Sequence, residues 1–76
     1  MKIIKVRWRD AVAIASWRLL EAPPEPDEVQ TVGYLVFEGP EHLIIATTVS
    51  DGEYNAAIQI LKVNLIGEPE EIGEHP

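Results

Sequence analysis

The sequence predicts a small, nearly all-β domain, and three observations lead to that prediction. Residues 2–9 alternate between apolar and basic side chains, which is typical of a half-buried strand. Further β-branched and aromatic runs cover residues 29–38, 42–50 and 56–63, and turn residues separate them. The chain has only 76 residues, which indicates a single domain with a thin core.

The first predicted strand has an apolar face and a basic face, formed by Ile4, Val6 and Trp8 and by Lys5, Arg7 and Arg9 respectively. After Asp10, a candidate N-cap, small and apolar residues without Gly or Pro favour a helix over residues 11–21. An irregular segment is the open alternative, because this stretch is alanine-rich and apolar almost all round. Pro23, Pro24 and Pro26 exclude helix and inner strand, so we expect a loop there.

The run over residues 29–38 is apolar on both faces, and Gly33 in its middle predicts a sharp bend. The elements expected after it are a turn at 38–41, a strand over 42–50, an Asp51-Gly52 reverse turn with polar residues 53–55, a strand over 56–63, a turn at 64–67 and a brief strand over 68–72. This order predicts a strongly bent five-stranded barrel of the SH3-like or Sm-like kind, with a helical or irregular insertion after the first strand. The barrel would occupy residues 1–72, with residues 73–76 as a polar tail.

The charge is unevenly distributed along the chain. The formal net charge is −7, with +4 on residues 1–18 and −11 on residues 19–76. The simpler interpretation is that the basic side chains pair with acidic ones of neighbouring strands. The alternative is a small cationic site for an anionic ligand. Both interpretations disfavour general nucleic-acid binding, because an acidic chain lacks the surplus of Lys and Arg that phosphate neutralisation needs.

Several site chemistries have little support in the sequence. Without cysteine there is no disulfide and no thiolate metal site, and the two histidines, His42 and His75, are far apart in the chain. The glycines are scattered singly, so no phosphate-binding loop is indicated. We therefore expect no metal, no cofactor, no catalytic residues and no enzyme activity. No targeting signal and no apolar run of membrane-spanning length is visible, so we expect a cytoplasmic protein without membrane contact.

One group of aromatic and charged residues is a candidate site for a ligand or a partner. An indole face beside a guanidinium and a carboxylate suits a nucleotide base or a charged side chain of a partner. The alternative is that both indoles belong to the core or cover it. The candidate residues are Arg7, Trp8, Arg9, Asp10, Trp17, Arg18 and Tyr34.

Four motifs together resemble a family of small uncharacterised bacteriophage and prophage proteins. These motifs are V-R-W-R-D followed by Trp17, then T-V-G-Y-L-V-x-E, I-I-A-T-T-V-S and I-x-I-L-K-x-x-x-I, and they extend over nearly the whole chain. The family pattern has Gly before the tryptophan and Pro before the lysine, where this chain has Ser16 and Leu61. The resemblance implies a phage accessory protein and supplies no catalytic residues.

Two functions follow as expectations. The first is a non-enzymatic phage-type accessory protein that binds a host protein in the host cytoplasm, for example in counter-defence or host takeover. The alternative is a homo-oligomeric Sm-like barrel that binds a nucleotide-like small molecule through Trp and Arg contacts. Both include self-association, because a domain of this size has a thin core and Ile, Leu and Val make up 22 of its residues.

Overall fold

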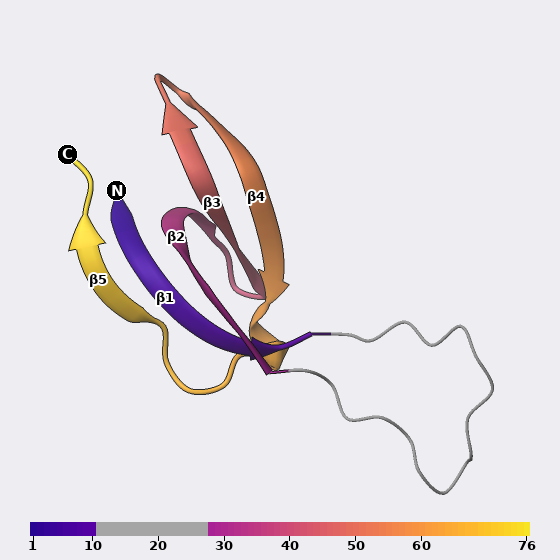
Figure 1. Ribbon diagram of the computed structural model, residues 1–76. Coiled ribbons are helices and arrows are strands. Elements are labelled where there is room, and N and C mark those ends of the chain that lie inside the picture. The colour runs from indigo at the N-terminus through magenta and orange to yellow at the C-terminus, as the bar shows by residue number, and fades with distance from the viewer. Residues whose placement is uncertain (11–27) are drawn as a thin grey trace, which may run out of the picture.

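Five antiparallel strands form one sheet in the computed structural model, which describes residues 1–10 and 28–76 (Figure 1). The spatial order is β4-β3-β2-β1-β5. The elements are β1 (Lys2–Arg9), β2 (Glu28–Glu38), β3 (His42–Ser50), β4 (Glu53–Leu61), the 3-10 helix η1 (Lys62–Asn64) and β5 (Glu70–Glu74). The predicted nearly all-β fold is confirmed. The sheet is not closed, however, because β4 and β5 lie at its two edges.

The predicted strands agree closely with β1, β2 and β3, whereas β4 is displaced. It begins at Glu53 rather than at residue 56, because the turn at Asp51-Gly52 already reverses the chain and Ser50 pairs directly with Glu53. Gly52 has a φ of 71°, a conformation that favours glycine. The strand ends at Leu61 rather than at residue 63, because Lys62 and Val63 belong to η1. The predicted helical or irregular insertion over residues 11–21, and the proline-rich loop up to residue 27, lie outside the described residues.

The last strand also differs from its predicted range. It runs over Glu70–Glu74 and therefore includes two residues that the sequence assigns to the polar tail. Beyond the strand, the backbone N–H of His75 donates to the Met1 carbonyl oxygen at 2.7 Å. At the other end of β1, the N–H of Ile66 donates to the Arg7 carbonyl oxygen at 2.8 Å. The chain after η1 thus follows β1 along most of its length.

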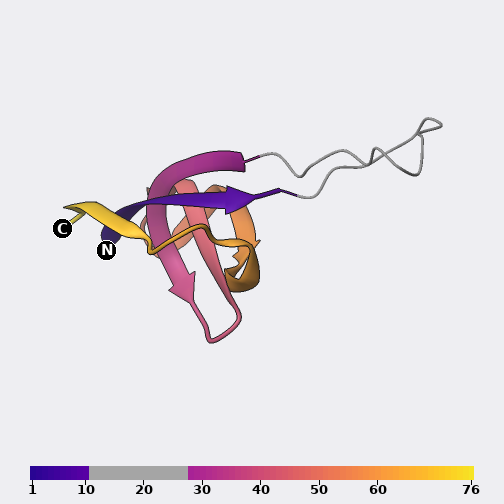
Figure 2. The same ribbon diagram turned by 90° about the horizontal axis from the view of Figure 1, so that it is seen from below.

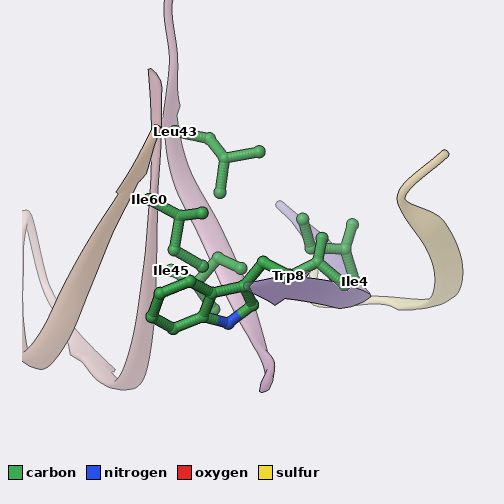
Figure 3. Close-up of a cluster of buried hydrophobic side chains, with 6 residues drawn as sticks. Ile4, Trp8, Leu43, Ile45 and Ile60 are labelled. Atoms are coloured by element: carbon green, nitrogen blue, oxygen red, sulfur yellow. The ribbon is translucent and has the colours of Figure 1, made fainter. Parts of the chain in front are cut away.

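The core lies between β1 and the β3–β4 hairpin, because the sheet bends until these strands face each other (Figure 3). The side chains on the apolar face of β1 are all buried, at most 7% exposed, as the alternation of residues 2–9 predicts. Each buried aliphatic side chain contributes roughly 1.5–3 kcal/mol. The core cluster consists of Ile4, Val6, Trp8, Leu43, Ile45 and Ile60, with Val29, Leu35 and Leu65 packed against it.

The bend runs through β2, which curves strongly between β1 and β3 (Figure 2). A Cβ atom at Gly33 would lie 2.6 Å from the carbonyl oxygen of Ala46 and 2.7 Å from Cγ2 of Ile45. Both distances are too short for any side chain. The missing side chain at Gly33 therefore lets β2 approach β3 closely, in agreement with the predicted bend.

We expect Gly33→Ala to lower the free energy of unfolding by about 1–3 kcal/mol, because its Cβ would push β2 away from a backbone carbonyl. Gly73→Ala is the matched control, since a Cβ there meets its nearest atom, Cδ1 of Ile3, at an ordinary 3.5 Å. Urea denaturation followed by circular dichroism measures both changes. Equal effects of the two substitutions would contradict the steric role of Gly33.

Candidate functional site

Trp8, one of the predicted site residues, is part of the core. Its side chain is 7% exposed and packs against residues of β3 and β4 (Figure 3). The indole N–H donates a hydrogen bond to Oγ1 of Thr31 at 2.9 Å, so the single polar atom of the buried ring has a partner. The structure therefore supports the core interpretation of Trp8, and its ring offers no open face for a ligand.

The basic face of β1 forms ion pairs with neighbouring strands, as the simpler interpretation of the charge distribution predicts. On the β5 side, Lys5 pairs with Glu70 at 3.8 Å, and on the β2 side Arg7 pairs with Glu28 at 3.6 Å. These pairs are largely exposed, so each contributes little to stability. The remaining pairs along β5 are Lys2 with Glu71 at 3.9 Å and the Met1 amino group with Glu74 at 3.1 Å.

The other predicted site residues do not join Trp8. Arg9 and Asp10 are exposed at the end of β1, and Arg9 lies opposite Glu28 in the strand register. Tyr34 is half-buried on β2, where its ring meets the His75 ring edge-on at 5.4 Å. Trp17 and Arg18 lie outside the described residues. Within the described ranges, the predicted aromatic and cationic residues thus form no single site.

The histidines lie at opposite ends of the sheet. His42 begins β3 and packs against the Phe37 ring at 5.0 Å, about 26 Å along the strand from Ser50. His75, in contrast, lines the same shallow depression as Ser50 and Asp51. Sequence order does not reveal this proximity, because it depends on how β5 returns along β1. The Nδ1 atom of His75 lies 2.8 Å from the carbonyl oxygen of Pro76.

Residues 1–10 and 28–76 contain no cluster of three or more metal-ligating side chains. No helix in these ranges is long and apolar enough to cross a membrane.

A cavity of about 220 Å³, which sequence reasoning missed, opens beside the core between β1, β2, β3 and the start of β5. Its floor is apolar, and three charged side chains surround its opening. The floor residues are Ile4, Leu35, Leu43 and Pro69, and the charged residues are Lys2, Glu38 and Glu71. These residues come from four separate parts of the chain, so no local motif could have indicated the cavity.

The carboxylates at the cavity opening are held by ion pairs. Oε2 of Glu38 accepts a hydrogen bond from Nζ of Lys62 at 3.0 Å, and Glu71 pairs with Lys2. The backbone N–H of Lys62 donates to the carbonyl oxygen of Glu41 at 2.8 Å, which joins the end of β4 to the β2–β3 turn. The cavity opening therefore has a defined arrangement of charges.

Comparisons of the chain with protein-family models, with curated proteins and with solved structures give no match.

We expect Thr31→Val to lower the free energy of unfolding by about 1–3 kcal/mol, because it leaves the indole N–H of Trp8 without its acceptor. Thr47→Val is a suitable control, since the Thr47 hydroxyl donates a bond of 3.2 Å at an exposed position. Thermal unfolding measures both effects. A neutral Thr31→Val would contradict the structural role of this hydrogen bond.

We expect Lys5→Gln and Glu70→Gln to show a coupling free energy of about 0.2–1 kcal/mol in a double-mutant cycle, because the two side chains form an exposed ion pair. Urea denaturation of the wild type, both single variants and the double variant measures it. The coupling should fall in about 1 M salt, where the Debye length is about 3 Å. A coupling free energy that does not change with salt would show that it does not arise from the attraction between the two charges.

Proposed function

We propose that this chain is a non-enzymatic accessory protein that acts by binding another protein, and that the cavity beside the core receives an apolar side chain of that partner. The observation that carries this proposal is the cavity itself, with its apolar floor and its charged opening. Its volume of about 220 Å³ lies below the range of about 300–1,000 Å³ typical of small-molecule sites. A single side chain of a protein partner fits this size better than a nucleotide does.

The charge of the surface favours a basic partner. After the ion pairs along β1 are formed, several exposed carboxylates of the described residues remain outside any ion pair there. They include Glu41, Asp51, Glu53 and Glu68. An acidic surface steers a basic protein toward it and raises the association rate at low salt. The phage origin and the host protein as partner rest on the resemblance of the sequence motifs alone.

The proposed fold type is an SH3-like or Sm-like barrel that is open between β4 and β5. The strand order β4-β3-β2-β1-β5, the bent β2 and the 3-10 helix before β5 support it. We also propose that the protein is a homo-oligomer. This part rests on the large apolar side chains that remain exposed in the described residues: Met1, Val32, Phe37, Tyr54, Ile58, Leu61, Val63 and Ile72.

A nucleotide-like ligand has less support than a protein partner. The indole of Trp8 is buried, so it is not available as the sequence-based hypothesis requires, and the exposed Arg7 guanidinium already has the Glu28 carboxylate at 3.6 Å. Quenching of the tryptophan fluorescence by a nucleotide, and its loss in Trp17→Ala, would favour this alternative nonetheless.

The test of the proposed function is capture of a partner at low salt on the immobilised chain, followed by a binding measurement with the purified partner. We expect one basic protein in stoichiometric amount, released between about 0.05 M and about 0.5 M salt. Glu38→Lys should weaken its binding at least about tenfold, since it reverses a charge at the cavity opening.

Glu53→Lys is the matched control, because it makes the same change of net charge at the β3–β4 turn, away from the cavity. It should weaken binding much less than Glu38→Lys. Equal effects of the two variants would show that only net charge matters, and the cavity would not be the docking site. Failure to capture any protein at low salt would count against the proposed function as a whole.

A further inference from the structure

The two edges of the sheet differ sharply in how well they are protected against pairing with another strand. β5 is short, and Glu70, Glu71 and Glu74 place three acidic side chains among its five residues. Short, charged edge strands resist pairing with other chains. β4 has nine residues, and Glu53 is its only charged residue. Among the described residues no strand lies beyond β4, so the N–H and C=O groups on its outer side can pair with a strand of another chain.

A local irregularity limits the usable part of the β4 edge. Ala56 has a φ of 53°, which interrupts the extended backbone, and its N–H bonds to Oδ1 of Asn55 at 2.7 Å. The pairing with β3 skips this residue and continues regularly from Ala57 onward. The regular segment is therefore Ala57–Leu61, with the sequence A-I-Q-I-L and no charge.

Exposed apolar side chains lie on Ala57–Leu61 and directly after it. Ile58 is 37% exposed and Leu61 is 50% exposed. Val63, in η1 directly after the strand, is 87% exposed, more than any other large apolar side chain among the described residues. An uncharged open edge with exposed apolar neighbours is an arrangement that a monomeric domain normally avoids.

We propose that two copies of this chain pair through Ala57–Leu61 of β4, antiparallel and related by a two-fold axis, so that the two sheets join into one. This inference specifies the contact in the self-association proposed above and rests on it. Antiparallel pairing of a segment with itself is compatible with two-fold symmetry, and β-branched and aliphatic side chains suit the contact.

Charge favours a second copy of β4 over β5 as the occupant of this edge. With a net charge of −7 on each chain, contact is least costly where the surface carries no charge. Pairing of β4 with β4 brings together the two neutral segments. Pairing of β4 with β5 in a ring would instead place the short β5, with its three glutamates, in every contact.

Sedimentation equilibrium of the full chain at micromolar concentrations tests this contact. The wild type should have twice the 8.5 kDa mass of one chain. Leu61→Lys should weaken the dimer at least about tenfold and give mainly monomer, because each copy places a charge in the shared edge. Ile72→Lys is the matched control, since Ile72 is 49% exposed and lies on the opposite edge strand. This variant should remain a dimer.

The remaining outcomes would overturn different parts of the inference. A monomeric wild type would overturn the self-association proposal together with its contact. A Leu61→Lys variant that is still a dimer would overturn the β4 contact alone. Dissociation by Ile72→Lys, or a mass well above that of a dimer, would indicate pairing of β4 with β5 in place of the two-fold contact.

A second variant keeps the contact testable if Leu61→Lys does not fold. Gln59 is exposed on the same segment, so Gln59→Lys removes no buried apolar group. It should dissociate the dimer in the same way, with an unchanged β-sheet circular dichroism spectrum. Amide exchange at residues 57–61 should be slower in the wild-type dimer than in the diluted monomer. A dimer that survives Gln59→Lys and shows no such protection would overturn the contact.

Discussion

The packing of β1 against the β3–β4 hairpin is the interaction on which the rest of this structure depends. The described residues form a single sheet with no second layer to cover its apolar face. That face can be buried only if the sheet bends and covers itself, which brings Trp8 of β1 against Ile45 and Ile60. The bend in turn requires a position where two strands come closer than a side chain allows, and Gly33 is that position.

The same bend places the basic face of β1 beside acidic neighbours. When the apolar face of β1 turns inward, its lysines and arginines turn outward between β2 and β5, and both neighbours present glutamates. The resulting pairs are exposed and individually weak, but they neutralise most of the positive charge in the described residues. β5 contributes no fully buried side chain, so these pairs and its backbone bonds to β1 hold it in place.

The surfaces that remain available lie where the sheet does not close. The cavity beside the core opens between β1, β2, β3 and the start of β5, and the charged side chains at its opening are joined in ion pairs, Glu38 with Lys62 and Glu71 with Lys2. The uncharged end of β4 lies at the sheet edge opposite β5 and is the contact that we propose for a second copy of the chain. An open sheet thus leaves two surfaces of different chemistry, and the proposed binding function rests on them.

The sequence by itself determined the all-β class, the strands β1, β2 and β3, and the division of β1 into an apolar face and a basic face. These features follow from period-two alternation and from charge sign, which are local properties of the chain. The polar residues 53–55 predict a later start for β4 than the structure has, because Asp51-Gly52 alone reverses the chain and Glu53 already belongs to the strand. Only the tertiary structure decided the burial of Trp8, the open sheet and the cavity. Each of these depends on how the sheet bends, which brings together residues from distant parts of the chain.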